Sequence, residues 1–154
     1  MIRRNPRIWA TALLCANILF IWGNSLLPAS VSGAISGWLS QFFDSVLGSL
    51  GEDLPGEGSL RKLAHFLEFT ALGVTLGWRI SLSRKNSWIL PAILTGVSVA
   101  SADELLQHLS PGRSPQVKDV GIDTAGLVLG IVLLSLGKYI RSKKQNELNG
   151  GKSK

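Results

Sequence analysis

Residues 120–140 read VGIDTAGLVLGIVLLSLGKYI, and this stretch decides the fold that we expect. It is apolar over most of its length, and about 20 such residues form a helix that crosses a hydrocarbon core roughly 30 Å thick. Three further stretches have a similar length and composition, at residues 8–27, 63–82 and 88–106. Because the membrane core offers no water to backbone polar groups, these spans should be α-helices. The sequence therefore predicts an all-α membrane protein with a bundle of four transmembrane helices.

The loop between the first two predicted spans has a helical pattern of its own. Apolar residues recur at spacings of three and four over about residues 34–50, beginning with Ile35, Trp38 and Leu39. The polar face of this segment carries no Lys or Arg, which argues against a helix that binds anionic lipid surfaces. We therefore expect an outer amphipathic helix that lies in the membrane interface or caps the bundle.

The composition of the 154-residue chain supports a membrane protein when the positions of its apolar and charged residues are considered. Apolar residues make up 45% and charged residues 17% of the chain, and the mean hydropathy is only +0.26 because polar loops dilute the spans. A single cysteine, Cys15, excludes a disulfide scaffold, and the apolar content excludes a disordered chain. The spans also leave too few residues for a two-domain enzyme with a large soluble core.

The basic residues indicate orientation. A net charge of +6 and a pI of about 9.9 would suggest nucleic-acid binding if the charges formed one patch. Instead, most of the 16 Lys and Arg residues flank one side of the predicted spans, within residues 3–7, 79–85 and 138–154. The positive-inside rule then places both termini in the cytoplasm. We therefore expect the lipid bilayer as a partner and no nucleic acid.

The first predicted span has an alternative interpretation. Two arginines, an apolar run and Pro28-Ala-Ser30 also fit a cleaved signal peptide. The apolar run is long for the core of a signal peptide. A retained helix also gives an even number of spans, so that the basic C-terminus lies on the same side as the N-terminus. We therefore interpret residues 8–27 as a membrane span.

Ionisable residues enter the second predicted span near its outer end. Ser59 is expected to be the helix N-cap, and Arg61, His65 and Glu68 then fall on one helical face. Charged groups at such depth cost about 2.5 to 3.5 kcal/mol each on insertion scales. These three side chains should therefore face polar partners on other helices.

The third and fourth predicted spans carry the partners. Asp103 and Gln107 share one face of the third span, with Glu104 about 100° around the helix. A short turn folds the third and fourth spans into a hairpin, and Asp119 and Asp123 lie on one stripe of the fourth. With a rise of about 1.5 Å per residue, all these groups fall in one layer roughly 7 to 14 Å below the outer helix ends.

Glycines continue the stripe of the fourth span below its carboxylates. Gly126, Gly130 and Gly137 lie on this stripe, and Gly73 and Gly77 have a helical spacing on the second span. Small residues let the backbones of neighbouring membrane helices approach closely. We expect these glycines to lie at helix contacts.

The polar layer allows three chemical interpretations. The first is a structural clasp, in which Arg61, His65 and Arg113 neutralise the carboxylates. The second is a divalent-cation site, but the spacings match no diagnostic metal motif such as His-Glu-x-x-His, so we assign no metal ligand and predict no cofactor. The third is catalysis, with His65 or Glu68 as base and Arg113 holding an anionic head group. The sequence has no Gly-x-Ser-x-Gly and no Walker loop, so we assign no catalytic residue and do not favour an enzyme.

Three strings of the sequence resemble the VanZ-like family of small bacterial membrane proteins. They are RKLAHFLEFTALG at residues 61–73, SADELLQHLSPGRS at residues 101–114 and KDVGIDTAG at residues 118–126. Asn24-Ser-Leu-Leu-Pro28 is similar to the stretch that follows the first helix of the family. The strings occur together, in the expected order and separation, and the resemblance covers about residues 20–130.

The resemblance implies a multi-pass protein of the bacterial cytoplasmic membrane, linked through the family's namesake to resistance against glycopeptide antibiotics, notably teicoplanin. We assign one VanZ-like transmembrane domain to residues 1–142 and expect a basic, flexible cytoplasmic tail over residues 143–154. The family's polar signature falls on nine residues, which we take as candidates for lining a ligand pocket: Lys62, His65, Glu68, Asp103, Glu104, Gln107, Arg113, Asp119 and Asp123. Helical geometry aligns Arg61, rather than Lys62, with His65.

Together these features predict an envelope membrane protein that binds a polar or anionic ligand in an outward-facing pocket. A lipid head group or a cell-wall precursor would have this chemistry. An intramembrane hydrolase or transferase that acts on a lipid-linked substrate is the alternative from another class. A purely structural subunit that binds another membrane protein is the third interpretation.

Overall fold

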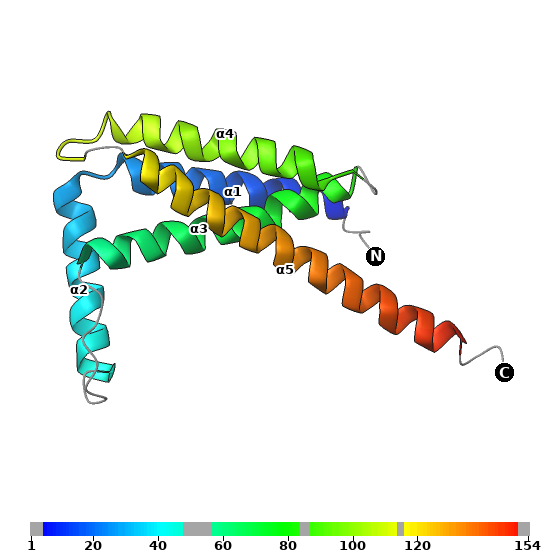
Figure 1. Cartoon of the computed structure of the whole chain (residues 1–154). Coiled ribbons are helices and arrows are strands. Elements are labelled where there is room, and N and C mark those ends of the chain that lie inside the picture. The colour runs from blue at the N-terminus through cyan, green and yellow to red at the C-terminus, as the bar shows by residue number, and fades with distance from the viewer. Residues whose placement is uncertain (1–4, 48–56, 84–86, 114–115, 151–154) are drawn as a thin grey trace.

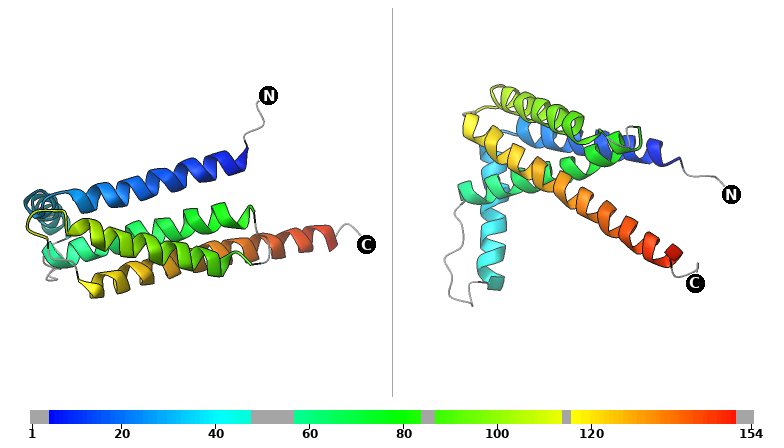
Figure 2. Two further views of the ribbon diagram at one scale, coloured as in Figure 1. Left: turned by 90° about the horizontal axis from the view of Figure 1, so that it is seen from above. Right: turned by 45° about the vertical axis from the view of Figure 1, so that its right-hand side comes forward.

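In the computed structural model, residues 5–47, 57–83, 87–113 and 116–150 are described, and they form five α-helices and no strand. The helices are α1 (Pro6–Leu26), α2 (Ala29–Leu47), α3 (Glu57–Ser81), α4 (Ile89–Gln107) and α5 (Val117–Gly150). Helices α1, α3, α4 and α5 form a bundle, whereas α2 leaves one end of it at a steep angle (Figure 1). The start of α1 and the end of α5 lie toward the opposite end (Figures 1 and 2). The prediction of an all-α protein is confirmed.

Three of the described helices, α1, α4 and α5, are long and apolar enough to cross a membrane. Helix α3 has 25 residues but does not belong to this group, because His65, Glu68 and Arg79 lower its hydropathy. Large apolar side chains point outward from the bundle, such as Leu19 in α1 and Leu94 in α4, which are 69% and 60% exposed. Such a surface is suited to lipid rather than water. The chain is therefore a membrane-embedded helical protein.

Two helix starts differ from the sequence-based expectation. Helix α2 begins at Ala29 rather than near residue 34, because the Pro28 carbonyl already accepts hydrogen bonds from the Val31 and Ser32 amides. Helix α3 begins at Glu57, so Ser59 is not its N-cap. The end of the predicted amphipathic helix, residues 48–50, lies outside the described residues.

Helix α5 is longer than the predicted span. It begins at Val117 and continues to Gly150, whereas we expected a flexible tail from residue 143 onward. Residues 143–149 read KKQNELN and include Lys, Gln, Glu and Leu, which are good helix formers. Residues 143–150 of the predicted tail therefore belong to α5.

Helices α3 and α5 make the closest contact in the bundle, and glycines build it. A side-chain carbon on Gly73, Gly126 or Gly130 would collide with a backbone carbonyl of the opposite helix. The predicted close approach of two backbones is therefore confirmed at these positions. A side-chain carbon on Gly137 would meet nothing within 4 Å. The C-terminal part of α5 diverges from the bundle (Figure 1). The expectation that Gly137 lies at a helix contact is wrong.

The apolar core lies between the four bundled helices. Ile21, Phe69, Leu72 and Leu127 are fully buried and come from α1, α3 and α5. Trp88, at the start of α4, is also buried. This core fixes the four helices side by side, so that polar residues near one end of each helix come together.

Candidate functional site

The turn between α4 and α5 is fastened to the last turn of α1. The Ser110 hydroxyl donates a 2.8 Å hydrogen bond to the Ser25 carbonyl, and Arg113 Nη2 donates a 3.0 Å bond to the Asn24 carbonyl. Carbonyls in the last turn of a helix lack donors within the helix. The turn supplies these donors and thereby closes the bundle at the end from which α2 departs.

A glycine shapes this turn. Gly112 has a φ of 77°, a backbone conformation that glycine adopts without steric cost. The preceding residue, Pro111, accepts a 3.1 Å hydrogen bond at its carbonyl from the Ala29 amide at the start of α2. The turn thus contacts both α1 and α2, and it carries Arg113 toward the polar residues of α3.

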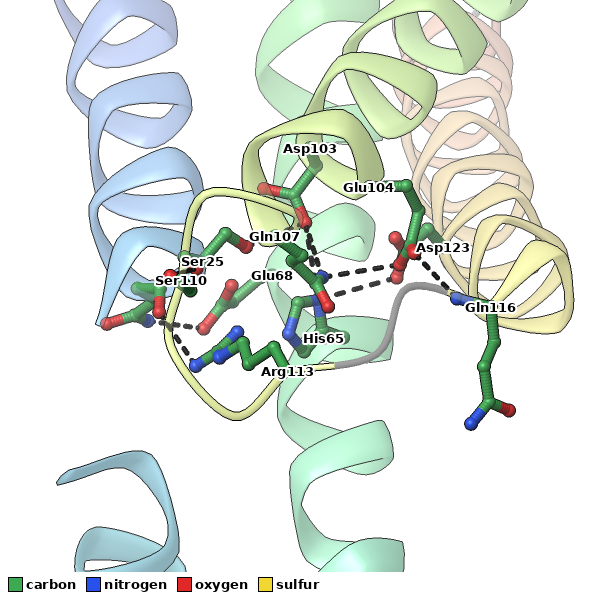
Figure 3. A network of polar contacts seen from close by, with 11 residues as sticks. Ser25, His65, Glu68, Asp103, Glu104, Gln107, Ser110, Arg113, Gln116 and Asp123 are labelled. Carbon is green, nitrogen blue, oxygen red and sulfur yellow. Dashed lines mark hydrogen bonds and ion pairs between the residues drawn. The ribbon is translucent and has the colours of Figure 1, made fainter. Parts of the chain in front are cut away.

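Asp103 is the buried centre of this polar end. Its carboxylate is 0% exposed, and its Oδ2 accepts a 2.8 Å hydrogen bond from the Ser25 hydroxyl and a 3.3 Å bond from Gln107 Nε2 (Figure 3). One donor comes from α1 and the other from the next turn of α4. These bonds fix the orientation of the carboxylate and leave Oδ1 without a hydrogen-bond donor among the described residues.

Glu104 faces the start of α5. Its Oε2 accepts a 3.0 Å hydrogen bond from the Gln116 amide, and its Oε1 accepts a 3.3 Å bond from Gln107 Nε2. Gln116 directly precedes α5, where amides lack intrahelical acceptors and the helix dipole is positive. Glu104 therefore acts as a cap that joins α4 to α5.

His65, Asp103 and Asp123 meet at the centre of the cluster from three different helices (Figure 3). His65 Nδ1 lies 3.8 Å from Asp103 Oδ2 and 3.7 Å from Asp123 Oδ1. These separations are too long for hydrogen bonds. Asp123 is 0% exposed, and neither of its oxygens has a hydrogen-bond donor in the described part of the chain.

A cavity of about 90 Å³ lies beside this centre, between α1, α2, α3 and the α4–α5 turn. Its polar lining consists of Asn24, Ser32, Arg61, His65, Glu68 and Arg113. Asn24 Nδ2 donates a 2.7 Å hydrogen bond to Glu68 Oε1, whereas Glu68 Oε2 is buried without a donor from the described residues. The cavity is thus lined by polar groups that retain hydrogen-bonding capacity.

The guanidinium group of Arg113 lines this cavity and has hydrogen-bond donors that lack acceptors among the described residues. Its Nε and Nη1 atoms are buried, and among the described residues neither has a hydrogen-bond acceptor. Burial, followed by the positive charge of Arg61, lowers the pKa of the Arg113 guanidinium below its usual value. Both effects act against the cationic form of the side chain, and a nearby anion would offset them.

A second, smaller cavity of about 10 Å³ lies on the α5 side of His65. Its polar lining consists of Arg61, Lys62, His65, Gln107, Asp119 and Asp123. Lys62 is exposed, while Asp119 is half-buried and its Oδ1 has no hydrogen-bond donor within the described residues. Arg61 and His65 line both cavities, as expected from their shared helical face.

The structure brings all nine predicted pocket residues to one end of the bundle. Sequence reasoning assigned no site role to four partners of these residues: Asn24, Ser25, Ser110 and Gln116. Asn24 and Ser25 could have been predicted from the sequence, because two polar residues in the last turn of an apolar helix require polar partners. The amide of Gln116 could not be found this way, because any residue type supplies a backbone amide.

Comparison with known proteins extends these observations. The family model described as VanZ/LLP1 matches residues 9–138, a range that includes parts of all five helices and every residue of the polar cluster. No curated protein and no solved structure matched the chain. Since the family match covers well over half of the sequence, the chain belongs to the VanZ/LLP1 family.

Proposed function

We propose that the protein binds the polar or anionic head group of an envelope lipid or a lipid-linked cell-wall precursor in the cavity beside Arg113. The observation that carries this proposal is the buried edge of the Arg113 guanidinium, where Nε and Nη1 lack acceptors in the described part of the chain. Arginine presents its donors as a rigid fork that matches phosphate and carboxylate oxygens. A phosphate or carboxylate in the 90 Å³ cavity would supply the missing acceptors.

The other lining residues fit the same ligand chemistry. Arg61 adds a second positive charge, and Ser32 adds a hydroxyl donor at the α2 side of the cavity. Glu68 carries an acceptor oxygen, Oε2, that has no donor among the described residues, so it suits a hydroxyl or amine next to the anionic group. Such a mixed lining favours a head group with both anionic and neutral polar parts.

We place the cavity on the outer side of the bacterial cytoplasmic membrane. In this arrangement α1, α3, α4 and α5 are four transmembrane helices, and α2 lies in the outer interface. Basic residues gather near the start of α1 and the end of α5, which supports cytoplasmic termini. The polar cluster and α2 lie at the opposite end of the bundle (Figure 1).

The interface position of α2 has support from its exposed apolar side chains. Val31 and Ile35 are 43% and 55% exposed. A helix that departs steeply from the spans and exposes apolar side chains is suited to the boundary between head groups and acyl chains. Helix α2 would then form one wall of the cavity at the depth where lipid head groups lie.

The family relationship supports a link between this pocket and glycopeptide resistance. A protein that holds a head group there would change how a lipid-linked precursor is presented to the antibiotic. We therefore include protection against teicoplanin in the proposed function.

Lipid retention tests the binding proposal directly. Purified protein would be mixed with phosphatidylglycerol or phosphatidylcholine, and retained lipid would be measured by native mass spectrometry. We expect Arg113→Gln to lower phosphatidylglycerol retention about tenfold or more, because charge-assisted hydrogen bonds contribute about 1.5 to 3 kcal/mol. Arg79→Gln is the matched control, since Arg79 lies at the other end of α3 and bonds to Thr11 and Ser83. Equal retention by Arg113→Gln and wild type would reject the proposed pocket.

His65 favours a second candidate function, an intramembrane hydrolase or transferase. Its imidazole lines both cavities and faces the carboxylates of Asp103 and Asp123. A histidine near carboxylates and an anion-binding arginine is suited to acid–base chemistry on a lipid-linked substrate. Incubation with labelled undecaprenyl-linked lipids and phospholipids, with and without divalent metal ions, tests it. Absence of turnover under all conditions would reject this candidate.

A further inference from the structure

Three potential metal ligands converge from three helices at the centre of the polar cluster. His65 of α3, Asp103 of α4 and Asp123 of α5 each offer a ligand atom, and the three atoms lie within 4.8 Å of one another (Figure 3). Ligands to one metal ion bind at about 2.0 to 2.2 Å, so neighbouring ligand atoms lie at most about 4.4 Å apart. The 3.7 and 3.8 Å separations from His65 Nδ1 to the two carboxylates fall within this limit. The two carboxylate oxygens lie within 4.8 Å of each other, so binding one ion would bring them closer by at most about 0.4 Å.

The burial of these groups provides independent support for a bound cation. Asp103 and Asp123 are both 0% exposed, and two buried carboxylates side by side are costly without a compensating positive charge. Both oxygens of Asp123, Oδ1 of Asp103 and Nδ1 of His65 are buried without hydrogen-bond partners in the described part of the chain. A cation at the centre would contact Asp123 Oδ1, His65 Nδ1 and Asp103 Oδ2, and the first two of these atoms have no hydrogen-bond partner in the described part of the chain.

A proton would satisfy the site less well than a metal ion. A protonated carboxyl group is a hydrogen-bond donor and needs an acceptor nearby. His65 Nδ1, at 3.7 Å from Asp123 Oδ1, is too far away to accept a hydrogen bond from it, and neither oxygen of Asp123 has a hydrogen-bond partner in the described residues. A divalent ion instead neutralises two carboxylates at once and needs only their lone pairs and that of the imidazole.

The surroundings have two further features of metal sites. The Ser25 hydroxyl and Gln107 amide hold the Asp103 carboxylate in place, as outer partners of metal ligands commonly do. The 10 Å³ cavity touches His65 and Asp123 and has room for about one water molecule. Three protein ligands and one open position for water are typical of sites that bind or activate a further ligand.

We propose that His65, Asp103 and Asp123 bind one divalent transition-metal ion. One imidazole nitrogen and two carboxylate oxygens favour Zn²⁺ or Mn²⁺, because Ca²⁺ and Mg²⁺ prefer oxygen ligands alone. Spacing along the chain could not show this site, because each ligand comes from a different helix. The metal site does not depend on the proposed head-group pocket, since Arg113 is not a ligand.

Metal binding by the full chain tests the proposal. The protein would be purified in detergent, stripped with a chelator, dialysed against Zn²⁺ or Mn²⁺ alone, and analysed by mass spectrometry for metal content. We expect about one ion per chain for wild type and an affinity lowered about tenfold or more by Asp123→Asn. Glu147→Gln is the matched control, because it makes the same change on an exposed part of α5. No saturable binding to wild type, or equal binding by Asp123→Asn, would overturn the proposal.

A second measurement uses wild type and does not depend on the folding of any variant. X-ray absorption of the Zn²⁺-loaded protein should show nitrogen and oxygen ligands at about 2.0 to 2.2 Å, with the multiple-scattering signature of one imidazole. A shell without an imidazole would contradict the assignment of His65. The lipid-retention experiment with Arg113→Gln contains no added metal, so failure of either proposal is distinguishable from failure of the other.

Discussion

The hydroxyl of Ser25 in α1 donates a 2.8 Å hydrogen bond to Oδ2 of Asp103 in α4, and both side chains are fully buried. This bond joins two helices that are far apart in the sequence. It also orients the Asp103 carboxylate, so that Oδ1 is left for another partner. The polar cluster is therefore tied to the packing of the bundle as well as to its chemistry.

We predict that Ser25→Ala destabilises the protein by about 1 to 3 kcal/mol, because a buried carboxylate loses a hydrogen-bond donor. Thermal unfolding in detergent, followed by circular dichroism, measures the effect. Ser98→Ala in α4 is the matched control, since its exposed hydroxyl bonds to the Leu94 carbonyl of its own helix. Equal unfolding temperatures for the two variants would show that the Ser25–Asp103 bond contributes nothing to stability.

A second prediction concerns the contact between α3 and α5. Gly130→Ala should destabilise the fold by about 1 to 3 kcal/mol, because its methyl group would collide with the Thr70 carbonyl. Gly137→Ala makes the same change on the same helix in open space, and it should be neutral or stabilising by up to about 1 kcal/mol. Unfolding in increasing denaturant compares the two variants. A larger loss from Gly137→Ala would contradict the described packing.

A third prediction separates the geometry of Arg113 from its charge. Arg113→Lys keeps the positive charge but loses the guanidinium fork. In wild type this fork bonds to the Asn24 carbonyl through Nη2 and leaves Nε and Nη1 for a ligand. We expect cells expressing Arg113→Lys to lose most of the protection against teicoplanin that wild type provides, at equal protein levels in the membrane. Arg79→Gln should keep this protection. Unchanged protection by Arg113→Lys would mean that charge alone is sufficient.

A fourth prediction tests the orientation of the bundle. In a Cys15→Ala background, His108→Cys at the end of α4 should react with a membrane-impermeant maleimide in intact cells. Lys143→Cys in α5 should react only after the membrane is permeabilised. Both side chains are exposed, so their reactivity reports the side of the membrane. The reverse pattern would place the polar cluster on the cytoplasmic side.

The sequence predicts the membrane class and the composition of the cluster because both depend on local pattern. Apolar length identifies α1, α4 and α5, and the cost of burying charge predicts that residues such as His65 and Asp123 meet. Contacts with the backbone and between distant helices could not be predicted in this way. The Gln116 amide that caps Glu104 is one example, because it depends on how the α4–α5 turn folds.

Helix ends were predicted less well for a related reason. The prediction ended the fourth span near residue 140, where the apolar pattern stops, but Lys and Glu continue α5 to Gly150 without any apolar stripe. The predicted contact stripe from Gly126 to Gly137 was correct only in its first part, since a side-chain carbon on Gly137 would meet nothing within 4 Å. Periodicity shows which residues share a face, but it does not show how far a partner helix follows that face.

The central claim is that Arg113 binds an anionic head group, and an electron cryomicroscopy structure in nanodiscs containing phosphatidylglycerol tests it most directly. The small chain would be enlarged by a bound antibody fragment that recognises an exposed segment away from the polar cluster. We predict phosphate density within about 3 Å of Arg113 Nε or Nη1, inside the cavity lined by Asn24, Arg61 and Glu68. A well-resolved cavity in which Arg113 pairs only with protein carboxylates, with no lipid density, would contradict the claim.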